Sequence, residues 1–202
     1  CFAVVTGCLE IAKESIFTGT NNFVSDTITD SRLNEYFGFT QSDVDLILKD
    51  ADAVKHAEKI REWYDGYQFG RFDVYCPWDV MNYLVDLQRN PDARPVSYWK
   101  NTSDNAIIRS FLDYAGNSIT RKMETLLDGG YIVQRIDEDL TYDYLHSSEE
   151  NLWSILYLTG YLTRVPAEKL RAELPDGFSA LKIPNAEICE IFELTVKKWF
   201  DD

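Results

Sequence analysis

"WYDGYQFGRFDVYCPWDV", residues 63–80, is the stretch that decides the fold of this chain. It is dense in aromatic residues, and Gly66 and Gly70 break it into short alternating segments. Such alternation around glycines predicts a β-hairpin, and Pro77 suits the first turn of a helix over 77–88. Because aromatic rings bury large areas, we expect the rings of this stretch to hold the hairpin between two helices. The rings concerned are Trp63, Tyr67, Phe69 and Trp78.

Asp65 and Tyr67, at the start of this hairpin, leave two interpretations open. In the first, Asp65 hydrogen-bonds turn amides, as Asp does in tight turns, and Tyr67 belongs to the core. In the second, both side chains contact a bound ligand. Base stacking by the rings is a further use of aromatic residues, but here they alternate with acids on the predicted core faces, which favours packing.

The rest of the chain predicts an α/β fold that is mostly α-helical with small β-hairpins. Thr40 and Asp43 form an acidic variant of the capping box, and Asn185 caps a final helix over 186–200. Further helices are predicted over about 54–64 and 118–127, with a strand candidate at 131–136.

The C-terminal half is predicted to be winged-helix-like. Ser148 begins a helix, strand candidates follow at 160–165 and 178–184, and a polar loop over 166–177 separates them. Helix, strand, loop, strand is the order of a winged-helix unit.

The apolar run at residues 2–6 reads as a strand buried on both faces, as in a parallel sheet. Since the chain opens inside this strand at Cys1, we interpret it as a fragment of a longer protein. An orphan strand exposes unpaired backbone, so we expect residues 2–6 to pair with a second copy of the chain or to join another local sheet.

Composition excludes several classes of function. With 20 Lys and Arg against 34 Asp and Glu, the net charge is −14 and the pI about 4.5, so direct nucleic-acid binding is not expected. The four cysteines contain no pair at CxxC spacing, which argues against a zinc site and for reduced thiols in the cytoplasm. No apolar run reaches the ~18 residues that a membrane span requires.

Catalytic constellations are not found in the sequence, and no residue is predicted to be catalytic or to bind metal. No phosphate-binding GxxxxGK[ST] loop occurs. His56 and His146 are both predicted to lie on the surface, and Cys76 is predicted to be a buried, inert thiol. The acidic turn at 137–139 is predicted to be a solvated loop.

Seven stretches, taken together and in order, resemble one family. They are "TGCLEIAKESIFTGTNN" (6–22), "EYFGFTQSDV" (35–44), "WYDGYQFG" (63–70), "VYCPWDVMNYL" (74–84), "YWKNTSDNAII" (98–108), "LWSILYLTGYL" (152–162) and "IPNAEICEIFE" (183–193). The chain resembles bacterial AAA-ATPase-like proteins, whose members typically join an ATPase-like module to a C-terminal PD-(D/E)XK nuclease-like domain.

The resemblance implies that the phosphate-binding loop lies upstream of this chain and the nuclease-like domain downstream, so both are its expected partners. Residues 1–100 then form the remnant of the ATPase-like core with attached helices and the aromatic hairpin, and 101–202 the winged-helix-like part. ATP and Mg²⁺ are implied for the whole protein, with no cofactor in this chain.

Within this resemblance Thr6 matches a sensor position near the γ-phosphate, and the alternative is that it only caps a strand or a helix. Candidate ligand-binding residues are therefore Thr6, Asp65 and Tyr67. The implied function is to relay nucleotide state to the nuclease-like domain without catalysis by the chain itself. The alternative is a non-catalytic, winged-helix-like protein-interaction module, and a homodimer stays open.

Overall fold

The computed structural model describes residues 28–29, 32–101, 117–138, 140 and 148–201. Within these residues the chain is a mixed α/β structure in which helices predominate, as the sequence predicted. The described strands form a two-stranded and a three-stranded sheet, both antiparallel. The predicted strand at 2–6, Thr6 and His146 lie outside the described residues. None of the described helices has both the length and the apolar content to cross a membrane.

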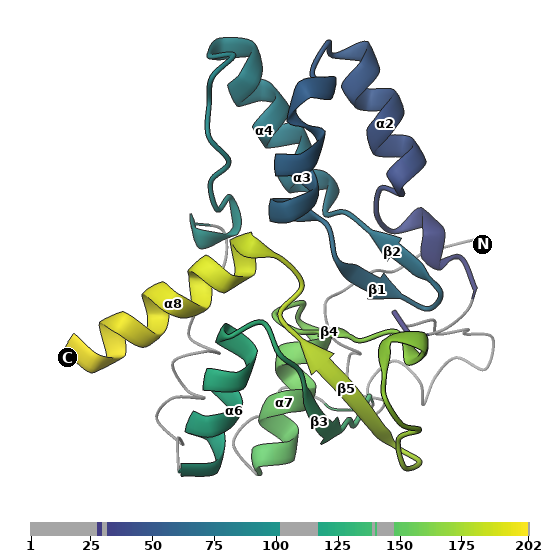
Figure 1. Ribbon diagram of the computed structural model, residues 1–202, viewed down its shortest axis with the longest axis vertical. Helices are drawn as coiled ribbons and strands as arrows, with labels where there is room; N and C mark the ends of the chain where they lie inside the picture. The colour runs from purple at the N-terminus through teal and green to yellow at the C-terminus, as the bar shows by residue number, and fades with distance from the viewer. Residues whose placement is uncertain (1–27, 30–31, 102–116, 139, 141–147, 202) are drawn as a thin grey trace, which may run out of the picture.

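Three helices form the first unit, which Figure 1 shows at one end of the molecule. They are α2 (Gln41–Asp50), α3 (Ala57–Tyr64) and α4 (Pro77–Arg89). Thr40 caps α2 as predicted: its hydroxyl accepts from the Asp43 amide at 3.3 Å, and the Asp43 carboxylate accepts from the Thr40 amide at 2.9 Å. This reciprocal pair satisfies backbone donors that the first turn of a helix leaves free.

The predicted hairpin is confirmed between α3 and α4. It consists of β1 (Tyr67–Phe69) and β2 (Phe72–Val74), with Tyr67 opposite Val74. Gly70 has a φ of 55°, which allows the tight two-residue connection. Pro77 is the first residue of α4, where its missing N–H costs nothing.

An N-terminal cluster of buried residues holds these elements together. Its members come from α2, α3, α4 and the segments beside them. They are Val44, Leu48, Ala53, Ile60, Tyr64, Tyr75, Val80, Tyr83, Leu84 and Leu87.

The second unit packs helices against the three-stranded sheet (Figure 1). Its elements are α6 (Asn117–Leu127), β3 (Ile132–Arg135), α7 (Glu149–Leu158), β4 (Thr163–Arg164) and β5 (Phe178–Lys182). The strand order is β3-β5-β4, and α6 and α7 both contact β3. Burial alternates along β3, with Ile132 and Gln134 buried and their neighbours exposed, so one face of the sheet carries the core.

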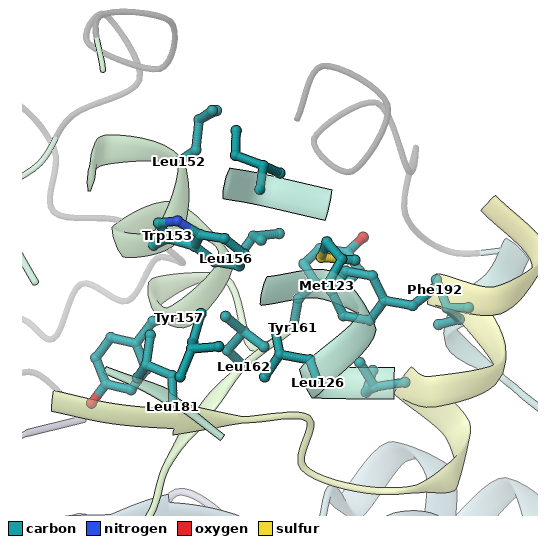
Figure 2. Packing of buried hydrophobic residues seen from close by; sticks show 14 residues of the cluster. Met123, Leu126, Leu152, Trp153, Leu156, Tyr157, Tyr161, Leu162, Leu181 and Phe192 are labelled. Atoms are coloured by element: carbon teal, nitrogen blue, oxygen red, sulfur yellow. The ribbon is translucent and has the colours of Figure 1, made fainter. Parts of the chain in front are cut away.

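Figure 2 shows the C-terminal cluster that fills the space between these helices and the sheet. Its buried members are Ile119, Met123, Leu126, Ile132, Leu152, Trp153, Leu156, Tyr157, Tyr161, Leu162, Leu181, Ile188, Ile191 and Phe192. All of them follow residue 100, whereas every buried member of the N-terminal cluster precedes it.

The last helix, α8 (Ala186–Asp201), touches both units, since it contacts α3 and α6. Asn185 caps it as predicted, with its Oδ1 accepting from the Ile188 amide at 3.1 Å. Ile188, Ile191, Phe192 and Thr195 form a buried stripe along this helix. The short 3-10 turns within the described residues are η1 (Asn34–Tyr36), η2 (Val54–His56), η3 (Trp99–Asn101) and η5 (Ala167–Lys169).

Two expectations about single side chains were wrong. Trp78 does not fasten the hairpin, because it lies on the outer face of α4 and keeps 56% of its surface exposed. His56 is not a surface residue: it is buried and packs its edge against the ring of Tyr83, at a centroid distance of 6.1 Å. Burial lowers the pKa of His56, which keeps the ring neutral inside the N-terminal cluster.

Candidate functional site

Asp65 and Tyr67, the candidate residues that the structure describes, lie in different surroundings. Asp65 follows α3, where its Oδ2 lies 3.7 Å from Nε of Arg61. Burial raises the pKa of the Asp65 carboxyl, while the Gly66 amide and Arg61 act to lower it. Tyr67 is buried, and its hydroxyl faces another set of polar groups. The polar groups next to Asp65 therefore differ from those next to Tyr67. A ligand that contacts both residues stays a prediction.

The polar groups around the Tyr67 hydroxyl come from four separate segments of the chain, and we call them the polar joint. They belong to β1, the start of α4, η3 and the start of α8. The members of the polar joint are Tyr67, Cys76, Asp79, Trp99, Asn185 and Glu187.

Local sequence places the two acids of the joint at the starts of their helices. Asp79 lies in the first turn of α4, after Pro77, and Glu187 lies in the first turn of α8, after the Asn185 cap. Carboxylates are favoured there because the free amides of a first turn carry partial positive charge. The first turns of α4 and α8 therefore each carry a carboxyl, and in the folded chain these two carboxyls interact with each other.

Close approach of the hairpin to the start of α8 depends on Gly66. Its φ is 109°, and a Cβ at this position would lie 2.2 Å from the carbonyl oxygen of Pro184. Gln68 adds a second link, since its amide donates to the Thr163 hydroxyl on β4 at 2.8 Å. The hairpin is thus fixed to both the helix and the sheet of the second unit.

Asp79 and Glu187 form a carboxyl pair that is cut off from solvent. Both side chains belong to residues with 0% exposure, and each carboxyl interacts directly with the other. Oε1 of Glu187 accepts from the Trp99 amide at 2.9 Å. Among the described residues, no cation forms an ion pair with either carboxyl.

Burial decides the protonation of this pair. Removal from water raises the pKa of Asp79, and it raises the pKa of Glu187 to about 8, helped by the neighbouring Asp79 charge. The amides of Trp99 and Tyr98 act in the opposite direction, but they do not outweigh desolvation. Glu187 is therefore mostly protonated at neutral pH.

Several polar atoms of the joint lack a well-formed hydrogen bond. They are the Tyr67 hydroxyl, both side-chain oxygens of Asp79, Nδ2 of Asn185 and Oε2 of Glu187. Buried polar atoms are normally paired, because an unpaired one costs about 1–3 kcal/mol. More of these unpaired buried atoms lie in the polar joint than in any other part of the described structure.

Two grooves of the described surface do not reach the carboxyl pair. The larger groove, of about 890 Å³, lies between the hairpin and the β4–β5 loop and is lined by residues such as Gln68, Gly70 and Pro166. A smaller one, of about 160 Å³, reaches Asn185. Neither is lined by Asp79 or Glu187, so the pair can hold a proton but has no described route to a substrate.

The larger groove contains charged groups that are already engaged. Nη2 of Arg164 donates to Oε1 of Glu138 at 2.6 Å, and its guanidinium carbon lies 5.2 Å from the ring centroid of Tyr157. Thr29 also donates to Glu138, at 2.6 Å. Within the described ranges, no group of three His, Cys, Asp or Glu side chains is arranged to hold a metal ion.

The Cys76 thiol is half-buried, not fully buried as predicted, but its pKa agrees with the prediction of an inert group. Burial raises its pKa to about 12, and the nearby Asp79 charge acts in the same direction. Since the thiolate is the reactive form, Cys76 is unreactive at physiological pH.

Sequence reasoning missed the two most deeply buried acids, although a signal was present. Asp79 precedes the buried Tyr83 by four residues, and Glu187 precedes the buried Ile191 by four. Residues four apart share a helix face, so both acids lie on the buried stripes of their helices. The helix dipole explains the position of Glu187 in the first turn of α8 but not its burial.

Comparison with known proteins identifies one distant relative. A protein of Azotobacter chroococcum mcd 1, whose name is "Uncharacterized protein in vnfD 5'region", is 26% identical over 191 residues. The match covers 93% of this chain and 32% of the relative, so the chain spans about a third of the length of that protein. No family model and no solved structure matches the chain.

Proposed function

We propose that this chain is a non-catalytic coupling module of a larger ATPase-like protein, and that the polar joint transmits movement between its two units. The observation that carries the proposal is a convergence. Five of the seven stretches on which the family resemblance rests contribute to the joint or its immediate contacts. Their residues are Gly66, Tyr67, Cys76, Asp79, Trp99, Gly160, Pro184, Asn185 and Glu187.

The resemblance supplies the finer part of the proposal. In the whole protein, an upstream phosphate-binding loop would bind ATP with Mg²⁺, and Thr6 would sense the γ-phosphate. The joint would pass that state to a nuclease-like domain downstream. A cytoplasmic location belongs to the same proposal and agrees with the free thiols of Cys76 and Cys189.

The test compares this chain with the longer protein that contains it. Calorimetric titration with Mg-ATP is expected to show binding by the longer protein and none by the 202-residue chain. Hydrogen exchange on the longer protein should then change at residues 183–193 when nucleotide is added. Failure of the longer protein to bind would remove the ATPase-like role, and binding without a change at 183–193 would remove the relay.

Direct DNA reading is not part of the proposal, even though the order α7, β4, loop, β5 agrees with a winged-helix arrangement. In such an arrangement α7 would be the recognition helix, which needs an exposed and basic face. Here Leu152 to Tyr157 are all buried, and the first turn of α7 carries Glu149 and Glu150. Fluorescence anisotropy with a labelled DNA duplex at low salt should show no binding, and binding that weakens steeply with salt would contradict this.

A second candidate function, an interaction module, is favoured by the outer face of α4. Trp78, Met81 and Val85 are each at least 40% exposed, and their spacing places them on one side of the helix. Because the relative is about three times as long as this chain, we propose another part of the same polypeptide as the occupant of this stripe.

The double variant Trp78→Ser, Met81→Ser tests this second candidate. It should increase hydrogen exchange along α4 in the longer protein, where the stripe would lose its occupant. In the 202-residue chain, hydrogen exchange along α4 should stay unchanged. The matched control is Val54→Ser, a 60% exposed apolar residue away from α4. A dimer of the 202-residue chain that the double variant dissociates would instead assign the stripe to a second copy.

A further inference from the structure

The polar joint holds two carboxyls with 0% exposure, in the first turns of α4 and α8, and no cation among the described residues forms an ion pair with either. If both were ionised, two negative charges would face each other in a medium that screens them poorly. If one proton lies between them, the pair becomes a strong hydrogen bond between a carboxylic acid and a carboxylate. That proton would also give Oε2 of Glu187 and one oxygen of Asp79 the partners that they otherwise lack.

We infer that Asp79 and Glu187 share one proton and form a latch, which joins the first turns of α4 and α8 and opens when the proton is lost. Loss of the proton leaves two buried anions, which only separation of the helices or entry of water relieves. The inference rests on the proposed function in one respect: it names proton loss as an event that would release the polar joint. The latch itself needs no nucleotide.

The other titratable groups around the latch do not change charge in the same pH range. From β1 and α3, Tyr67 and Tyr64 face the pair, and burial raises the pKa of both phenols. From the start of α4, the Cys76 thiol has its pKa raised to about 12. From η3 and the segment before it, the pair receives the amides of Trp99 and Tyr98, and Asn185 at the start of α8 is neutral.

The sign of the pH dependence follows from linkage. Folding raises the pKa of Glu187 from its ordinary 4.5 to about 8, so the folded state holds the proton more tightly than the unfolded state. The stability that the proton contributes is complete below about pH 4.5 and is lost as the pH rises to about 8. A difference of one bound proton changes the unfolding constant by up to about tenfold per pH unit in this window.

The decisive experiment follows urea unfolding of the 202-residue chain from pH 5 to pH 9. The variant Glu187→Gln mimics the protonated form, because its amide can donate to Asp79 while its oxygen still accepts from Trp99. Between pH 5 and pH 8, the wild type should lose stability relative to this variant, with the unfolding constant rising by up to about tenfold per pH unit. The matched control is Glu193→Gln, an exposed acid on the same helix, which should follow the wild type.

Carbon-13 NMR of labelled glutamate carboxyls gives a readout that does not depend on stability. One resonance should titrate near pH 8 in the wild type and be missing in Glu187→Gln. If that variant does not fold, Asp79→Asn takes its place, since an amide opposite Glu187 also removes the shared proton. Equal pH dependence in wild type and variant, or no carboxyl that titrates above pH 7, would overturn the latch.

Hydrogen exchange locates the opening. The amides of Ile188 and Cys189, which bond to Asn185, should lose protection above pH 8 in the wild type and keep it in Glu187→Gln. Loss of protection spread evenly over both units would contradict an opening at the joint. None of these three measurements uses nucleotide, so a failed latch and a failed ATPase-like role give separate results.

Discussion

The N-terminal and C-terminal clusters are both rich in rings, but they satisfy the polar groups around them differently. In the N-terminal cluster, tyrosine hydroxyls bond to the loop after α4. The Tyr64 hydroxyl donates to the Val96 carbonyl at 3.0 Å and accepts from the Val96 amide at 3.2 Å, and the Tyr83 hydroxyl donates to the Ala93 carbonyl at 2.9 Å. In the C-terminal cluster the sheet pairs its own backbone, and the Tyr157 hydroxyl has no hydrogen bond.

The difference shows what each cluster requires from its rings. Residues 90–98 have no helix or strand to pair their backbone, so the tyrosines of the first unit act as both core and hydrogen-bond partners. The second unit needs its rings mainly for buried area, since β3, β4 and β5 already pair one another. Hydroxyl removal should therefore matter in the first unit, and ring removal in both.

The largest expected effect is that of Trp153→Ala in the C-terminal cluster. Trp153 has 0% exposure and lies beside Leu156 in the cluster that Figure 2 shows, so its loss leaves a cavity. We expect a fall of about 3–5 kcal/mol in the free energy of unfolding. Urea denaturation measures it, and Trp78→Ala, with its ring 56% exposed, is the matched control at within about 0.5 kcal/mol. Equal losses in the two variants would show that Trp153 is not buried.

Gly66→Ala should have the next largest effect, because it acts on the contact between the two units. A Cβ there meets the Pro184 carbonyl and requires an unfavourable positive φ, which together should cost about 2–4 kcal/mol. Gly129→Ala controls for the backbone term, since its φ is 79° and nothing lies within 4 Å of the added Cβ. The cost of Gly66→Ala beyond that of Gly129→Ala measures the contact, and no excess would mean that the hairpin and α8 are not in contact.

The smallest expected effect compares two hydroxyls directly. Tyr64→Phe removes both bonds to Val96 and should cost about 1–2 kcal/mol, whereas Tyr157→Phe removes a hydroxyl without a bond and should change stability by close to zero. Both values come from the same denaturation assay. A cost for Tyr157→Phe equal to that for Tyr64→Phe would remove the distinction between the clusters.

Local signals in the sequence were enough to predict most described elements. The Thr40 and Asp43 pair, Pro77, the glycines of the hairpin and Asn185 each act within a few residues, so their effects could be read without the fold. The helix and strand order of the second half followed from apolar spacing in the same way.

Long-range packing explains the errors. The exposure of Trp78 depends on which side of α4 packs against other elements. The sequence around Pro77 contains no signal that predicts this. His56 has charged neighbours in the sequence, Lys55 and Lys59, which suggested an exposed position. In the structure the ring of Tyr83 from α4 packs against it. Glu187 looked like an ordinary first-turn acid, and only the approach of α4 made it a buried one.

By itself, the sequence determined where several of the described helices begin and which residues turn the hairpin, and it contains no recognisable catalytic motif. These properties depend on the conformational preferences of short segments and on spacing within one helix or strand. Only the tertiary structure decided that Asp79 and Glu187, 108 positions apart in the numbering, lie together with no ion-paired cation among the described residues. Their pKa values are set by burial and by the charge of a carboxyl that is distant in sequence but close in space. Both effects arise only when the two units pack together.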